Sequence, residues 1–242
     1  MILANAGGGS APAAGDEPIA LLGGTFDPVH YGHLRFADAV RRELGLHDVR
    51  LVPSALPPHR EPAHADAADR LAMLDLAVRE FPGLVVDARE IVRGGRSYTV
   101  DTLEALRREH PATPLVLLVG ADAFRGLPAW HRWRDLFDLA HTVVVPRPGS
   151  QLDDDLPPAL AAEWQARHTA DPKALRARRA GSIYVQPVAP HAISATQIRN
   201  ALAQGDVRTV DALLPAPVLA YIGSHRLYQP PHGTPTRPTH AS

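Results

Sequence analysis

The sequence predicts an α/β protein built on a doubly wound parallel sheet, and three observations support this fold class. Short apolar runs that are typical of strands alternate along the chain with longer amphipathic runs that are typical of helices. The run Leu115–Val119 is wholly apolar, as expected of a parallel strand that helices cover on both faces. The first predicted strand runs into a glycine turn and then a helix, an arrangement found in nucleotide-binding sheets.

Hydrophobic periodicity and turn residues place the elements of the first half. The helix predicted at His33–Leu44 has an apolar side and an arginine-rich side, and Pro111 ends the helix predicted at Thr99–His110. The inner side of the helix predicted at Asp66–Phe81 is expected to be Leu71, Leu74, Ala77 and Val78. The strands predicted in this half are Ile19–Gly23, Val49–Pro53, Leu84–Asp87 and Leu115–Val119.

The second half is less regular. Ser194 or Thr196 lies near the start of one predicted helix and Gly205 just past its end, which are typical helix signals. The elements predicted here are helices at Trp133–Ala140, Leu156–His168, Ser194–Gln204 and Pro217–Leu227, and strands at Thr142–Pro146 and Ile183–Gln186. We expect a single domain over residues 18–228 that ends in a small helical part, between disordered tails at residues 1–17 and 229–242.

Composition and charge narrow the class of protein. The chain has 242 residues and a formal net charge of −1, so no strong field predicts nucleic acid or a membrane as a partner. It has no cysteine, which excludes disulfides and thiol chemistry, and no apolar run approaches the length of a membrane span. A cytoplasmic location is expected, because the start of the chain lacks the features of a signal peptide; the sequence leaves a homo-oligomer open. Lys173 is the only lysine beside 24 arginines, so groups that touch phosphate should be arginine, histidine or backbone N–H.

The most informative segment is Gly23–His33, which reads Gly-Gly-Thr-Phe-Asp-Pro-Val-His-Tyr-Gly-His. A strand that enters a glycine turn and then a helix places free N–H groups and the positive end of the helix dipole at one spot, which suits a phosphate. The imidazoles of His30 and His33 can donate further hydrogen bonds there. No Gly-Lys-Ser/Thr follows, as a Walker loop would require, and the spacing does not match the dinucleotide fingerprint. A lone histidine is more often a helix cap or a surface residue, and zinc would need further ligands in a chain without cysteine.

Two loops should overhang the same carboxyl edge of the sheet. In Pro53–Arg60 the prolines stiffen a loop whose His59 and Arg60 could clamp a substrate phosphate, although a rigid surface loop would look alike. Ser97–Thr102 begins a helix, where hydroxyls either cap the helix or help to recognise a small polar substituent of a ring.

Three further motifs carry polar or aromatic groups. Asp122 follows a strand and could accept a ribose hydroxyl or cap a helix. Trp130, in a loop, could stack on a heteroaromatic ring or simply pack. Ile193–Arg199 opens a late helix whose hydroxyls and N–H groups form a second phosphate cradle, with Arg199 one turn into it.

Together these motifs resemble those of bacterial nicotinate-nucleotide adenylyltransferases, whose superfamily hallmark is His-x-Gly-His, here His30 to His33. The resemblance runs from Ile19 to Tyr228 and includes Pro-Pro-His-Arg, Ser-Tyr-Thr-x-x-Thr-Leu, Gly-x-Asp, Pro-x-Trp, Arg-Pro-Gly and Ile-Ser-Ala-Thr-x-Ile-Arg. It implies a nucleotidyltransferase that joins nicotinate mononucleotide to the AMP part of ATP in NAD synthesis. Mg²⁺ would be carried by ATP rather than by a protein metal site.

The resemblance also implies roles for individual residues. His30, His33 and Arg199 would be catalytic, stabilising charge on the phosphates of ATP. The other ATP-binding residues that it implies are Gly23, Gly24, Thr25, Phe26, Gly32, Gly120, Asp122, Arg147, Ser194 and Thr196. The residues that it implies for the mononucleotide are Asp27, His59, Arg60, Thr99, Trp130 and His131.

Two departures from the family pattern stand out: Ser54-Ala55 where relatives carry polar amide residues, and His131 where they often carry another aromatic residue. Pantetheine-phosphate adenylyltransferases and cytidylyltransferases share the first and last motifs, but the segments Ser97–Thr102 and Pro128–His131 argue against both. An idle nucleotide-sensing module is a further alternative, disfavoured by the intact histidine pair.

Overall fold

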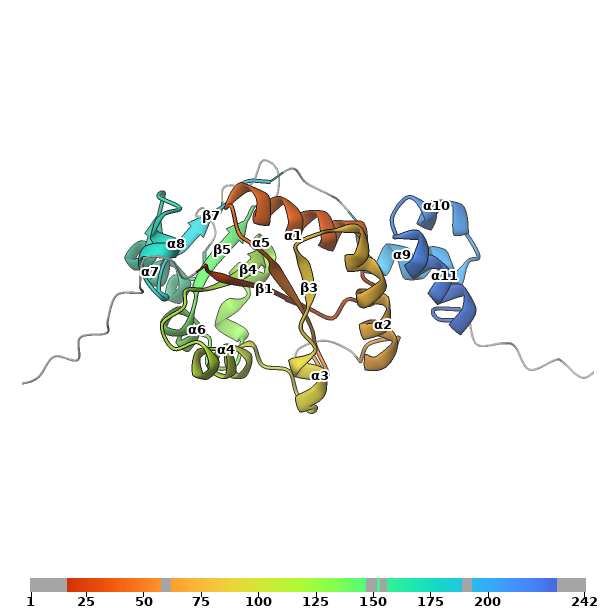
Figure 1. Ribbon diagram of the computed structural model, residues 1–242, viewed down its shortest axis with the longest axis horizontal. Helices are drawn as coiled ribbons and strands as arrows, with labels where there is room; N and C mark the ends of the chain where they lie inside the picture. Colours follow the sequence, from red (N-terminus) through yellow and green to blue (C-terminus); the bar gives the residue numbers. More distant parts are fainter. Residues whose placement is uncertain (1–16, 58–61, 147–151, 153–155, 189–192, 230–242) are drawn as a thin grey trace, which may run out of the picture.

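The computed structural model describes residues 17–57, 62–146, 152, 156–188 and 193–229. Its centre is a seven-stranded sheet in which every neighbouring pair of strands is parallel, in the order β3-β2-β1-β4-β5-β7-β6 (Figure 1). The strand order reverses between β1 and β4, and in such sheets ligands bind at the carboxyl ends of the strands at this point. The strands are β1 (Ile19–Gly24), β2 (Val49–Pro53), β3 (Leu84–Val86), β4 (Leu115–Gly120), β5 (His141–Val145), β6 (His168–Thr169) and β7 (Ile183–Val185).

Helices cover both faces of the sheet, so the predicted doubly wound fold is confirmed. The α-helices are α1 (Tyr31–Glu43), α2 (Ala67–Ala77), α3 (Arg89–Arg93), α4 (Thr99–Glu109), α5 (Ala121–Arg125), α6 (Asp135–Leu139), α7 (Pro158–Arg167), α8 (Ala174–Ala177), α9 (Ala195–Ala203), α10 (Val207–Asp211) and α11 (Ala216–His225). The 3₁₀ turns are η1 (Val78–Glu80) and η2 (Leu127–Ala129). Sequence periodicity did not predict α3, α5, α8, α10 and β6, because each is too short to show a repeat.

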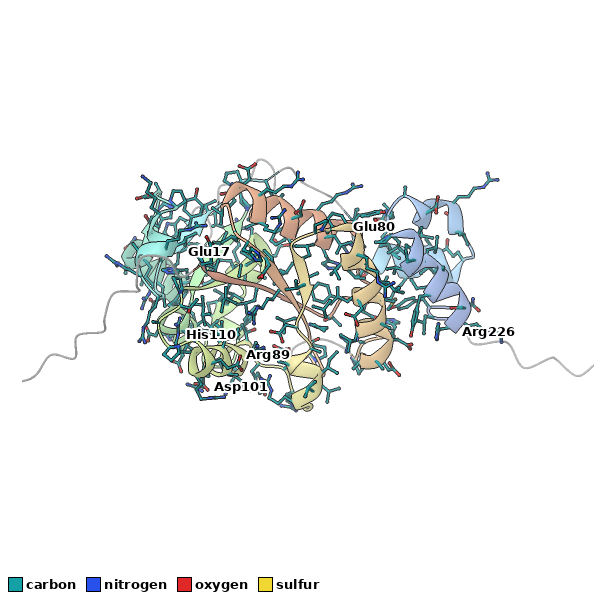
Figure 2. The ribbon with its side chains drawn as sticks, viewed as in Figure 1. Glu17, Glu80, Arg89, Asp101, His110 and Arg226 are labelled. Carbon is teal, nitrogen blue, oxygen red and sulfur yellow. The ribbon has the colours of Figure 1, made fainter. Side chains whose placement is uncertain are left out.

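Two hydrophobic cores lie on the two faces of the sheet. Alternate strand residues point to opposite faces, so Leu118 of β4 packs with α1 and α2 while Leu117 packs with α4 and α6. This is why the run at Leu115–Val119 is apolar at every position. Side chains fill the space between sheet and helices, whereas exposed charged residues such as Glu80 and Arg226 lie at the periphery (Figure 2).

The inner face of α2 differs from the prediction. Its buried residues are Arg70, Met73, Leu74 and Ala77, whereas Leu71 and Val78 are only half-buried. The periodicity was therefore displaced by one position, because an arginine occupies a place that the pattern assigns to an apolar residue. Asp66 precedes the helix and its carboxylate accepts from the Asp69 amide, so the predicted start is confirmed within one residue.

The described part of the chain closes with α9, α10 and α11, which pack together at one end of the molecule beside α2 (Figure 1). The hydroxyl of Tyr221 in α11 donates to the Asp69 carboxylate of α2 at 2.9 Å. This helical part therefore holds the N-terminus of α9 over the carboxyl edge of the sheet. The predicted tails lie almost wholly outside the described residues.

Candidate active site

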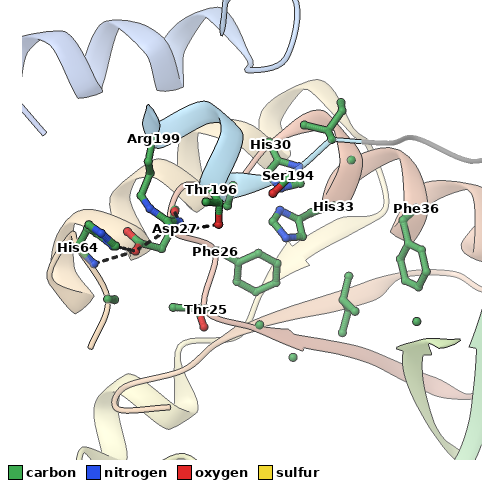
Figure 3. Close-up of a pocket in the computed structure, with 18 of the residues that line it drawn as sticks. Thr25, Phe26, Asp27, His30, His33, Phe36, His64, Ser194, Thr196 and Arg199 are labelled. Atoms are coloured by element: carbon green, nitrogen blue, oxygen red, sulfur yellow. Dashed lines mark hydrogen bonds and ion pairs between the residues drawn. The ribbon is translucent and has the colours of Figure 1, made fainter. Parts of the chain in front are cut away.

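The turn between β1 and α1 brings two histidines together. The rings of His30 and His33 stack at 3.7 Å between centroids, and Phe26 lies edge-on to His33 at 5.1 Å (Figure 3). Gly32 makes this packing possible, because a Cβ at that position would lie 2.8 Å from Nδ1 of His30. The glycine between the histidines is thus required by the close approach of the first ring to the helix.

Burial determines the charge of His30. The residue is 4% exposed, and burial lowers its pKa to about 4. Its Nδ1 has no hydrogen-bond partner among the residues that the structure describes. The imidazole is therefore uncharged at neutral pH in the free protein, and it can act on a ligand as a hydrogen-bond donor rather than as a cation.

A first pocket, with a volume of about 750 Å³, opens over these histidines. The β1–α1 turn forms one wall, and Gly120 and Asp122 at the end of β4 form another. Ser194, Thr196 and Arg199 of the α9 segment also line it; Ser194 lies beside His30, and Arg199 points toward Asp27 (Figure 3). The side chain of Ser194 makes no capping hydrogen bond although the residue is the N-cap of α9, so helix capping does not account for its hydroxyl. Two helix N-termini therefore converge on one cavity, an arrangement suited to a polyphosphate.

A second pocket of about 400 Å³ adjoins the first. Thr99 at the start of α4 lines it together with Trp130 and His131, and the His131 ring lies 4.4 Å from that of Tyr98. The hydroxyl of Ser54 is buried at this pocket without a hydrogen-bond partner in the described part of the chain. The two pockets share Leu22, Gly23, Gly24, Thr25, Gly120 and Asp122, so they meet at the carboxyl ends of β1 and β4.

The structure brings most of the predicted site residues to these pockets. Gly23, Gly24, Thr25, Phe26, Asp27, His30, Gly32, His33, Gly120, Asp122, Ser194, Thr196 and Arg199 line the first, and Thr99, Trp130 and His131 line the second. His59, Arg60 and Arg147 lie outside the described residues.

The carboxylate of Asp27 is buried and hydrogen-bonded within the protein, so it is not free to bind a ligand. Its carboxylate is 6% exposed and accepts hydrogen bonds from the amides of His64 and Ala65, at 2.8 and 3.1 Å, and from the Tyr228 hydroxyl at 2.8 Å. Its backbone carbonyl accepts from Arg199 at 2.7 Å. The carboxylate is thus engaged within the protein.

Sequence reasoning missed three residues at this site. Glu90 lines the second pocket and accepts from the Thr102 hydroxyl at 2.6 Å, and burial raises its pKa. Arg70 lies buried behind the turn, and Tyr228 reaches Asp27 from the end of the chain. Only Arg70 left a signal in the sequence, as a charged residue on the otherwise apolar face of a helix.

Within the described ranges there is no group of three or more His, Cys, Asp or Glu side chains that could hold a metal ion. No helix in the same ranges has both the length and the apolar character needed to cross a membrane.

Comparisons with known proteins agree with the fold and with this site. The model of the cytidylyltransferase-like family matches residues 21–201, so the chain is a nucleotidyltransferase of that family. The protein named "Probable nicotinate-nucleotide adenylyltransferase" of Aeromonas salmonicida is 51% identical over 88% of this chain and 97% of its own length. A protein of the same name from Laribacter hongkongensis is 53% identical over 87% of this chain and 94% of its own length. Within the class, the chain belongs to the family of nicotinate-nucleotide adenylyltransferases.

Solved structures confirm the fold independently. The nicotinic acid mononucleotide adenylyltransferase of Plasmodium falciparum, complexed with NaAD, superposes with a TM-score of 0.66 at 15% identity, covering 88% of this chain and 97% of the other. The same protein complexed with APC gives a TM-score of 0.64 over the same shares. At this level of identity the likeness concerns the fold alone.

Proposed function

We propose that the protein transfers the adenylyl group of ATP to nicotinate mononucleotide, giving nicotinate adenine dinucleotide and pyrophosphate, in NAD biosynthesis. The observation that carries the proposal is the pair of adjoining pockets. One is lined by two stacked histidines and the N-terminus of α9, and the other by Thr99, Trp130 and His131. A dinucleotide product requires two such pockets that meet where the new bond forms.

The first pocket would hold ATP. His30 and His33 contact the phosphates, and Ser194, Thr196 and Arg199 hold the β- and γ-phosphates. Asp122 and Gly120 meet the ribose, and Gly23, Gly24, Thr25, Phe26 and Gly32 shape the backbone around the nucleotide. Arg147 is assigned to the same nucleotide from the resemblance alone. The facing helix N-termini support this arrangement, because both direct partial positive charge at one cavity.

The second pocket would hold the mononucleotide. Thr99 and Trp130 frame the ring, and the backbone amide of His131 lies near its carboxylate; a backbone contact tolerates the histidine at this position. His59 and Arg60 are proposed for the phosphate. Asp27 is proposed to act on the mononucleotide indirectly, through the backbone amides of His64 and Ala65 that its carboxylate binds. The buried Ser54 hydroxyl adds one polar group where relatives carry an amide side chain.

The reaction is a direct in-line displacement. A phosphate oxygen of the mononucleotide forms a bond to the α-phosphorus of ATP, and the bond from that phosphorus to the bridging oxygen breaks. Pyrophosphate leaves with the electron pair. The nucleophile is already an anion, so no general base is needed, and catalysis comes from positioning and from hydrogen bonds to the developing charge. The uncharged His30 can supply such a bond, because a neutral imidazole still carries one ring N–H.

Mg²⁺ enters this proposal as part of the substrate, bound to the triphosphate and water. A cytoplasmic location also belongs to the proposal, and a homo-oligomer stays open, as it does from the sequence. Cell fractionation tests the first, and size-exclusion chromatography with light scattering tests the second.

Pyrophosphate release from ATP is the direct test of the activity. Purified protein is assayed with nicotinate mononucleotide, with the nicotinamide form and with no acceptor, and the dinucleotide product is identified by mass. We expect release only with an acceptor, with a higher kcat/KM for the nicotinate form. ATP binding without turnover of any pyridine mononucleotide would instead identify a nucleotide-sensing module.

A further inference from the structure

Arg70 is a buried arginine behind the two pockets. It lies in α2 and is only 1% exposed. Its guanidinium donates to three backbone carbonyls: Nη1 to Thr25 at 2.7 Å, Nη2 to Ala55 at 3.1 Å and Nε to Ala65 at 3.3 Å. Because the guanidinium is planar and rigid, these bonds fix three separate chain segments in one plane.

Each of the three segments borders a substrate pocket. Thr25 lines both pockets. Ala55 lies next to Ser54, which lines the second pocket, and its own amide is held by the Ser97 hydroxyl at 2.8 Å. Ala65 follows His64, which lines the first. One side chain therefore joins the floor that the pockets share to a wall of each.

Asp27 supplies the opposite charge. Burial lowers the pKa of Arg70, whereas the charge of Asp27 raises it, as expected of a buried cation near a carboxylate. Asp27 holds the amides of His64 and Ala65 while Arg70 holds the carbonyl of Ala65, so this segment is fixed through both kinds of backbone group. Arg199 donates to the backbone carbonyl of Asp27 and so connects α9 to the same residue.

We propose that Arg70, with Asp27 as its counter-charge, is a positioning residue that fixes the two substrate pockets relative to one another. The inference rests on the proposed function, because in-line transfer needs both substrates in one alignment. A misplacement of about 1 Å can slow such a reaction by about 10²-fold. Lysine at this position would keep the charge but could not hold three carbonyls in one plane.

Arg107 offers a matched control. It is a partly buried arginine that, like the fully buried Arg70, donates to backbone carbonyls, including those of Thr113 at 2.8 Å and Leu139 at 2.7 Å. Burial lowers its pKa as it does that of Arg70. Its partner Thr113 lies before the first residue of β4, whereas both pockets lie at the other end of that strand. Arg107→Lys should therefore cost stability without changing the alignment of the pockets.

The test compares Arg70→Lys with Arg107→Lys at a temperature where both are folded. We expect kcat to fall by about 10²-fold in Arg70→Lys, with both KM values within a few-fold of the wild type, and to stay unchanged in Arg107→Lys. An unchanged kcat in Arg70→Lys, or an equal fall in both variants, would overturn the proposal.

Hydrogen exchange in the substrate-free protein separates this inference from the proposed function, because it does not depend on turnover. Amides at residues 54–57 and 62–66 should exchange faster in Arg70→Lys than in the wild type, and Arg107→Lys should leave their exchange unchanged. Equal exchange in the wild type and Arg70→Lys overturns the inference even if the wild type is active. If the wild type shows no adenylyl transfer, the proposed function fails and exchange alone decides on Arg70.

If Arg70→Lys does not fold, Tyr228→Phe decides, since it removes one hydrogen bond to Asp27. Faster exchange at 62–66 with a lower kcat supports the proposal, and no change in either overturns it.

Discussion

His30 should make the stability of this protein sensitive to acid. Its pKa is lowered by burial from 6.5 to about 4. Between these values the unfolded chain binds a proton that the folded protein does not. The contribution of His30 to the free energy of unfolding is therefore fully present above pH 6.5 and is lost as the pH drops through this window. The gap, at about 1.4 kcal/mol for each pKa unit, amounts to about 3 kcal/mol. This is a large part of the roughly 5–15 kcal/mol that stabilises a typical domain.

Urea unfolding at pH 7.0 and pH 4.5 measures this contribution. Other groups also titrate, so the relevant quantity is the loss of unfolding free energy in the wild type minus the loss in His30→Gln, whose side chain does not titrate. We expect a difference of about 2–3 kcal/mol. His47→Gln, at a histidine whose side chain is 83% exposed, serves as the control for the general effect of replacing a histidine by glutamine.

Parallel pH dependences in the wild type and His30→Gln would contradict this prediction, because they would mean that His30 takes up its proton as easily in the folded protein as in the unfolded chain. With a pKa of about 4, titration of His30 also makes no contribution to the pH profile of kcat/KM between pH 6 and 8. That profile reports the free enzyme and free substrates, in which this imidazole is already uncharged.

Four further predictions concern the chemistry and the pockets. His33→Ala should lower kcat by about 10²-fold or more in steady-state assays, as does the loss of a preorganised donor; a kcat near that of the wild type would remove His33 from the mechanism. Thr196→Val removes the hydroxyl that Arg199 contacts at 3.3 Å and should raise KM for ATP several-fold, while KM for the mononucleotide stays unchanged. Incubation with α-labelled ATP alone should leave the protein unlabelled, and a labelled protein on a denaturing gel would establish a covalent intermediate instead. Glu90→Gln should leave thermal stability unchanged or higher above pH 7, because burial disfavours the charged form of the carboxyl group. Glu90→Leu removes the acceptor of the Thr102 hydroxyl and should cost about 1–3 kcal/mol. Equal stability of the two variants would contradict this.

The strands other than β6 and most of the longer helices could be predicted because their signals are local. Leu115–Val119 is apolar at every position, and Ser194 and Gly205 bracket α9. The helix at α2 shows the limit of such reasoning. The helical period was predicted, but the buried side was displaced by one position, because Arg70 lies buried where the pattern expects an apolar residue. Its guanidinium is satisfied by the carbonyls of Thr25, Ala55 and Ala65, and the charge of Asp27 favours its charged form.

Local sequence was enough to predict the parallel sheet, the turn with His30 and His33, and the family, because each rests on neighbouring residues or on their spacing. The folded chain was needed to show that His30 is uncharged, that Asp27 is engaged within the protein, and that Arg70 connects both pockets. Burial and hydrogen bonding depend on groups that lie far apart in the chain, so no local pattern predicts them. The bond from Tyr228 to Asp27 spans 201 positions, and no local pattern of residues records it.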